Sequence, residues 1–142
     1  MLAVSWRDVV LAVLPSAQLT PGAPAAAVAS AGERLGTRLP ADLAALLQET
    51  DGVRSADGNH LIWPVTRIVN DNLTARDTLP AFKDPDAPLL FGASGGGSDR
   101  VAWDPASPAH IIVWDQDTDE RRPVAVDLAD YLTRVLAEEA DL

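Results

Sequence analysis

The chain of 142 residues contains no cysteine, so disulfides, thiol nucleophiles and thiolate metal sites are all excluded. It contains only two histidines, His60 and His110, and neither has a second imidazole or a carboxylate nearby at metal-ligand spacing. We therefore expect no metal site and no bound cofactor. Each histidine opens a short apolar run, which indicates a position at the edge of a sheet.

Basic residues are scarce. Lys and Arg total 11 against 21 Asp and Glu, and the net charge is −10. A surface of this sign repels a phosphate backbone, which argues against a nucleic-acid partner, and it attracts a basic protein.

Long apolar runs are also missing. No stretch approaches the roughly 18 residues that a membrane span needs, and the start of the chain lacks the basic segment of a secretory signal. We therefore predict a cytoplasmic protein with no membrane contact. Asn72-Leu73-Thr74 matches a glycosylation acceptor, but without a secretory route it is interpreted as a helix surface.

Apolar residues recur at helical spacing in the first half of the chain and cluster in short β-rich runs in the second half. A single domain over residues 1–142 is predicted, of the α+β class, with a mostly antiparallel sheet of about four to six strands flanked by helices. The strands 89–92, 101–104, 110–115 and 124–126 are expected to form a meander. The helices are predicted at 6–14, 25–35, 39–52, 65–76 and from Leu128 onward, with residues 18–24 as a connector.

Three local patterns suggest other chemistry. The glycine-rich run from Gly92 to Arg100 has the glycine spacing of a phosphate-binding loop, but Ser98 stands where the lysine is required. The stretch starting at Asp115 begins like a calcium loop, yet its sixth residue is Glu120 and its twelfth is Val126 in place of Gly and Glu. Gly92-Ala93-Ser94-Gly95-Gly96 satisfies the nucleophile-elbow pattern, so a small hydrolase using Ser94 and a histidine stays an alternative.

Several short motifs occur in an order that resembles the SUKH superfamily. They are a helix opened by Leu39-Pro40 and closed by Asp51-Gly52, a strand ending in Phe91-Gly92, the turn Gly97-Ser98-Asp99, a strand ending in Trp103-Asp104, the strand Ile112-Val113-Trp114-Asp115, and a last helix with Tyr131-Leu132. This superfamily includes the yeast cell-wall-assembly regulator domain and many bacterial immunity proteins. The resemblance covers about residues 25–137.

The resemblance implies an α+β fold and a binding role without catalysis, most often the neutralisation of a cognate toxin by occlusion. A regulatory scaffold that binds several cellular proteins is the alternative within the superfamily. We expect carboxylates to match a toxin groove that is basic because it handles nucleic acid, and one tryptophan to add apolar area. The predicted partner-binding residues are Asp99, Trp103, Asp104, Asp115, Asp117, Asp119 and Glu120.

Overall fold

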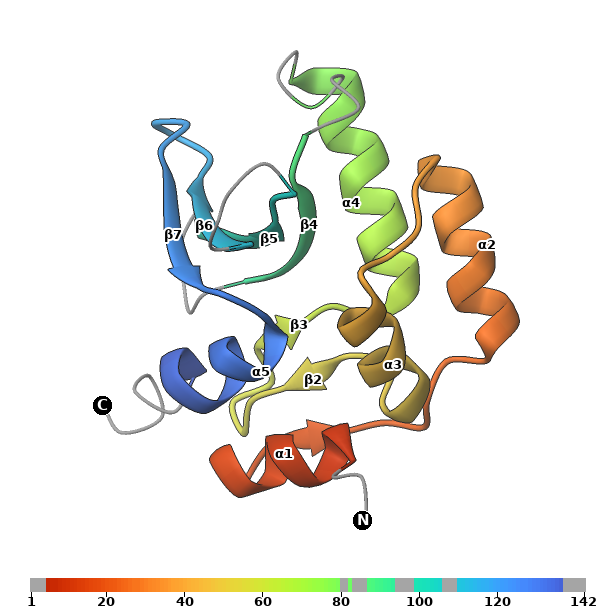
Figure 1. Ribbon diagram of the computed structural model, residues 1–142, viewed down its shortest axis with the longest axis vertical. Coiled ribbons are helices and arrows are strands. Elements are labelled where there is room, and N and C mark those ends of the chain that lie inside the picture. The colour runs from red at the N-terminus through yellow and green to blue at the C-terminus, as the bar shows by residue number, and fades with distance from the viewer. Residues whose placement is uncertain (1–4, 80–81, 83–86, 94–98, 106–109, 137–142) are drawn as a thin grey trace.

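The computed structural model describes residues 5–79, 82, 87–93, 99–105 and 110–136. Figure 1 shows helices gathered around one side and one end of a strongly curved sheet. The helices are α1 (Trp6–Val13), α2 (Ala25–Leu35), α3 (Ala41–Glu49), α4 (Val65–Thr78) and α5 (Leu128–Asp130), and α5 continues as the π-helix η2 (Tyr131–Leu136). The strands are β1 (Gln18–Leu19), β2 (Val53–Arg54), β3 (His60–Ile62), β4 (Leu89–Ala93), β5 (Asp99–Trp103), β6 (Ile111–Asp115) and β7 (Arg121–Ala125).

The seven strands form one sheet in chain order, and every neighbouring pair is antiparallel. The predicted α+β class and the meander are confirmed. The sheet has seven strands, more than the expected four to six, because the expectation did not include the two-residue strands β1 and β2. The segment predicted as a connector holds β1, where Gln18 pairs with Arg54 and Leu19 with Val53.

The helix boundaries follow local capping chemistry. The Ser5 hydroxyl accepts the Asp8 N–H at the start of α1, and the Asp127 carboxylate accepts the Asp130 N–H at the start of α5. Gly36 ends α2 with a left-handed φ of 73°. Helix α3 ends earlier than predicted, because its chain turns extended at Thr50, two residues before Gly52.

Gly52 has a different role from the helix end predicted for it. Its φ is 97°, and a Cβ there would come within 2.9 Å of both the Ile62 carbonyl oxygen and the Pro64 nitrogen. A glycine is therefore required where the segment after α3 passes the end of β3.

The helices and the sheet share one hydrophobic cluster. Helix α4 packs between α2 and β4, and α1 contacts both α3 and η2 (Figure 1). Leu128, Tyr131 and Leu132 of the last helix are buried, as its amphipathic pattern predicts. Asn72 is not at a helix surface as expected, since only 3% of it is exposed and it faces β4. Among the described residues, no helix is long and apolar enough to cross a membrane.

Candidate functional site

Five of the seven predicted partner-binding residues lie together at one end of the sheet. Asp99 opens β5, Asp115 closes β6, and Asp117, Asp119 and Glu120 belong to the turn that leads into β7. The three turn residues are exposed, whereas Asp99 and Asp115 are half-buried. We call these five residues the acidic end of the sheet.

Asp99 and Asp115 are direct cross-strand partners on β5 and β6. Side chains in this position project from the same face of the sheet, and like charges directly opposite each other destabilise a strand pair. No hydrogen bond of the Asp99 carboxylate with another described residue is found, so a basic group on a partner could pair with it. The two residues are 16 positions apart along the chain, and the register of the β5–β6 hairpin brings them together.

The turn itself is held by its own carboxylates. Asp119 accepts a hydrogen bond from the indole Nε1 of Trp114 at 2.7 Å, and it does so from a left-handed backbone with φ of 59°. Asp115 Oδ1 accepts the Asp117 N–H at 2.8 Å. These bonds fix the turn against the buried Trp114, which meets Phe82 edge-on with a centroid distance of 4.9 Å. These bonds therefore hold the turn of the acidic end in place.

Three arginines lie at the same end of the sheet, namely Arg100, Arg121 and Arg122, and they reduce its net charge. Arg100 and Arg121 align with Trp114 in the strand register, so they project from the face opposite to Asp99 and Asp115. The ion pair from Arg121 Nε to Asp119 Oδ1 is 3.9 Å long and exposed, and such pairs contribute about 0–1 kcal/mol. Arg122 pairs with Val113, so it projects from the same face as Asp99 and Asp115 and partly offsets their charge. The negative potential is therefore greatest at the turn.

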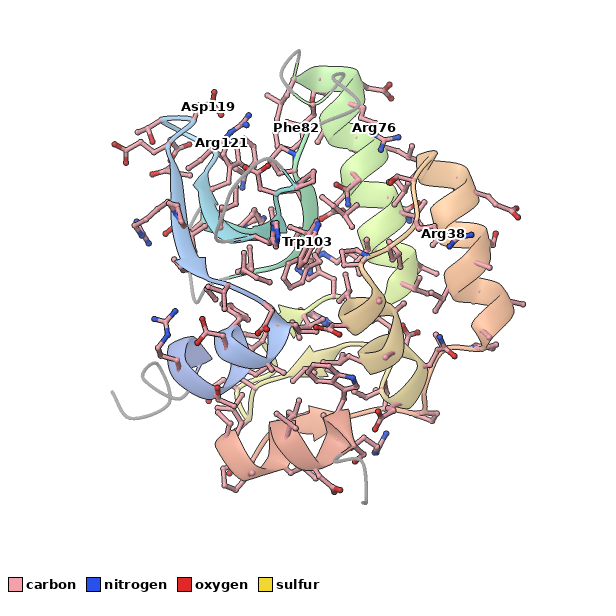
Figure 2. All side chains as sticks on the ribbon, viewed as in Figure 1. Arg38, Arg76, Phe82, Trp103, Asp119 and Arg121 are labelled. Carbon is pink, nitrogen blue, oxygen red and sulfur yellow. The ribbon has the colours of Figure 1, made fainter. Side chains whose placement is uncertain are left out.

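The other two predicted residues, Trp103 and Asp104, lie at the opposite end of β5. At ~3.3 Å per residue the strand separates Trp103 from Asp99 by about 13 Å, and Figure 2 shows Trp103 well away from Asp119. Trp103 is half-buried, and its ring stacks on the His110 imidazole with a centroid distance of 4.9 Å and an interplanar angle of 27°. Asp104 and His110 bridge the strand ends, since the Asp104 N–H donates to the His110 carbonyl at 2.7 Å. The predicted partner-binding residues therefore form two separate groups, the acidic end and the pair Trp103 and Asp104.

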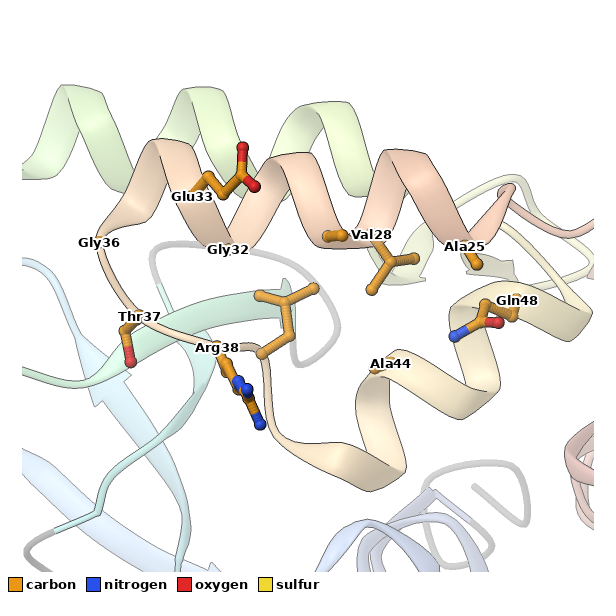
Figure 3. Close-up of a pocket in the computed structure, with 11 residues that line it drawn as sticks. Ala25, Val28, Gly32, Glu33, Gly36, Thr37, Arg38, Ala44 and Gln48 are labelled. Carbon is orange, nitrogen blue, oxygen red and sulfur yellow. The ribbon is translucent and has the colours of Figure 1, made fainter.

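A groove that the sequence analysis missed lies between α2 and α3 (Figure 3). Its volume is about 690 Å³. Ala25, Ala29 and Gly32 line it from one face of α2, and Arg38 and Gln48 lie at its edge. The spacing of these small residues at i, i+4 and i+7 is the signal that could have predicted a hollow on this helix, because small side chains leave space above it.

A second hollow, of about 360 Å³, lies beside the β2–β3 hairpin. Arg54, His60, Asp51 and Thr20 line it. His60 is the cross-strand partner of Arg54, so two basic side chains lie next to each other in this strongly acidic protein. His60 opens a strand, as its sequence position predicts, but β3 lies between β2 and β4 and is not at the edge of the sheet. The pairing of His60 with Arg54 was not predicted.

The described residues give little support to the alternative functions, namely a hydrolase, a phosphate-binding loop or a calcium site. Ser94 of the hydrolase alternative lies outside the described residues, and so does the glycine-rich segment 94–98. The strand β5 begins five residues after Ser94, where an elbow would lead into a helix. In the part of the chain that the structure describes, no group of three or more His, Asp or Glu is arranged to hold a metal ion.

Comparison with known proteins agrees with the fold. Comparison with curated protein sequences finds no significant match. A family model described as SMI1-KNR4 cell-wall, of the SUKH group, matches residues 26–132, which span the chain from α2 to the start of η2. Because this match covers most of the chain and the elements occur in the order that the motifs predicted, the protein belongs to the SUKH superfamily.

Proposed function

We propose that this protein is a non-enzymatic immunity protein that neutralises a cognate toxin by covering its active site or an essential surface. SUKH domains are protein-interaction domains, and the superfamily includes both immunity proteins and regulators of the SMI1/KNR4 type. The toxin surface is a basic groove of the kind that binds nucleic acid, and the acidic end of the sheet provides the matching charge.

The observation that carries the proposal is the pairing of Asp99 with Asp115. Two carboxylates placed directly opposite each other weaken the β5–β6 pair. Asp115 also holds the turn through the Asp117 N–H, so it is the Asp99 carboxylate whose charge we assign to binding. Asp117 and Glu120 extend the charge onto an exposed turn that Trp114 holds in place through Asp119. A charged turn that is already held by hydrogen bonds needs little ordering when it binds, which favours affinity.

Trp103 and Asp104 form a second contact group in this proposal. A standard interface covers about 800 Å² on each partner, which is wide enough to span the roughly 13 Å between the two groups. The middle of β5 between them is buried, as Val101 is fully covered. A single toxin would therefore contact the two ends of the strand separately.

The test begins with tagged protein used to capture its partner from the lysate of its own cells, followed by mass spectrometry. We expect one large toxin or nuclease polypeptide, and binding that weakens as salt increases. The double variant Asp117→Lys/Glu120→Lys should weaken binding by about tenfold or more, because it replaces attraction by repulsion at the centre of the charge. Asp77→Lys, an exposed carboxylate on α4, is the matched control and should bind like the wild type.

Unchanged affinity in the Asp117→Lys/Glu120→Lys variant would remove the acidic end from the interface. Trp103→Ala then tests the second group independently.

A regulatory scaffold is the second candidate, and the cell-wall description of the matching family model favours it. It predicts capture of several cellular proteins and no protection against a toxin. Co-expression separates the two functions, because an immunity protein restores growth to cells that produce its toxin, whereas a scaffold does not.

A further inference from the structure

The hollow beside the β2–β3 hairpin lies among basic groups, although the protein as a whole carries a charge of −10. Arg54 and His60 face each other across the two strands and both line it. Arg67, in the first turn of α4, is close enough for its charge to act on His60. These three side chains come from β2, β3 and α4, and only the fold brings them together.

Arg54 is unusual among these groups because nothing in the described part of the chain accepts a hydrogen bond from it. Its Nε is buried without a partner, and so is Nδ1 of His60. Arg67, in contrast, is already engaged, since its guanidinium lies 4.4 Å from the centroid of the Trp63 ring and its Nε contacts Asp71 Oδ2 at 3.3 Å. Buried donors without acceptors are costly, and guanidinium groups bind carboxylate and phosphate oxygens well.

The turn of the β2–β3 hairpin lies close to the side chain of Arg54. Gly58 has a φ of 88°, and a Cβ at this position would be 3.3 Å from an amino group of the Arg54 guanidinium. A larger residue in the turn would displace the arginine. Asp51 is the acidic residue that lines the hollow, and its Oδ1 is occupied as the acceptor of the Val65 N–H at 2.8 Å, where it caps α4.

We propose that Arg54 and His60 form a binding site for an oxyanion, a carboxylate or a phosphate group, in the hollow of about 360 Å³ that they line with Thr20. The guanidinium of Arg54 provides the fixed positive charge and His60 a second donor when it is protonated. The β2–β3 hairpin lies at the other end of the molecule from the turn between β6 and β7 (Figure 1), so the site does not depend on the identity of a toxin. The charged groups around His60 are Arg54 from β2, Arg67 from α4 and Asp51 before β2.

The experiment follows the imidazole signals of His60 by NMR during titration with sodium phosphate and, separately, with sodium acetate. Ionic strength is kept constant with sodium chloride. His110 lies in the Trp103 stack and serves as the internal reference. We expect a saturable shift of the His60 signals and an increase in its pKa, while His110 is unchanged.

Arg54→Gln should lose the response, and Arg34→Gln, an exposed arginine on α2, should retain it. Saturation by acetate alone identifies a carboxylate ligand, such as an acidic side chain of a partner, and saturation by phosphate identifies a phosphate ligand. The proposal is overturned if neither anion gives a saturable shift in the wild type, or if Arg54→Gln responds equally. Since the wild-type titration decides by itself, poor folding of a variant would not prevent the test.

Discussion

The side-chain amide of Asn72 on α4 pairs with the backbone of Leu90 on β4. The Leu90 N–H donates to Asn72 Oδ1 at 2.9 Å, and Asn72 Nδ2 donates to the Leu90 carbonyl at 2.8 Å. The amide takes the place of a neighbouring strand at Leu90, because the backbone of residues 62–63 pairs with β4 at Phe91 and Gly92. A third bond, from Nδ2 to the Ile68 carbonyl at 2.6 Å, fixes the amide on its own helix. Asn72 therefore joins α4 to the sheet.

Asn72→Ala should strongly destabilise the fold. It leaves the N–H and the carbonyl of Leu90 buried without partners, at about 1–3 kcal/mol for each group. Urea denaturation should show a loss of about 2–4 kcal/mol in the free energy of unfolding. Asn70→Ala, at an exposed position on the same helix, is the control and should change stability by less than about 0.5 kcal/mol. Equal effects of the two substitutions would contradict the role of the Asn72–Leu90 pairing.

Gly52→Ala and Gly36→Ala form a second matched pair of substitutions. Both glycines have a positive φ, but a Cβ at Gly36 meets nothing within 4 Å, whereas one at Gly52 overlaps the backbone of Ile62 and Pro64. Gly36→Ala should cost about 1 kcal/mol for the left-handed backbone alone. Gly52→Ala should cost about 2 kcal/mol more, because the clash is with rigid backbone. Thermal denaturation measures both, and a smaller loss for Gly52→Ala would disprove the close approach.

Glu49, at the end of α3, holds the start of α1. Its carboxylate accepts the Trp6 N–H at 3.0 Å and the Arg7 N–H at 3.3 Å. Glu49→Ala should therefore release the first turn of α1, with a loss of about 1 kcal/mol, since these N–H groups have no partner within the helix. Native-state hydrogen exchange should show faster exchange at Trp6 and Arg7, while Glu49→Gln, which keeps one acceptor, should have a smaller effect. Unchanged exchange at Trp6 in the alanine variant would contradict this contact.

His60 should make stability depend on pH below neutrality. Burial, with the charges of Arg54 and Arg67 adding to it, lowers the pKa of His60 from its ordinary value of 6.5. The unfolded chain then binds a proton more readily than the folded chain, so stability is full above 6.5 and falls as the pH decreases through 6.5 toward the folded pKa. Urea midpoints at several pH values should decrease over this range in the wild type. The decrease should be smaller in His60→Asn, and an identical pH dependence in both proteins would rule out His60 as its source.

The local patterns of the sequence predicted most of the fold. The apolar spacing in α2 and α4 and the β-rich runs at β4, β5 and β6 depend on neighbouring residues, so they identify the elements without tertiary information. The motif order from Leu39-Pro40 to Tyr131-Leu132 predicted the SUKH superfamily, which the match over residues 26–132 confirms. The strands β1 and β2 were not predicted, because two residues carry no periodic signal.

The charge of −10, the absence of cysteine and the order of the longer helices and strands follow from the sequence alone. Which residues come into contact depends on the tertiary fold. It placed Asp99 opposite Asp115 and Arg54 opposite His60, it separated Trp103 from Asp119, and it buried Asn72 against Leu90. The physical reason is that helical and strand periodicity act over a few residues, whereas strand register and the packing of α4 on β4 depend on contacts between distant parts of the chain.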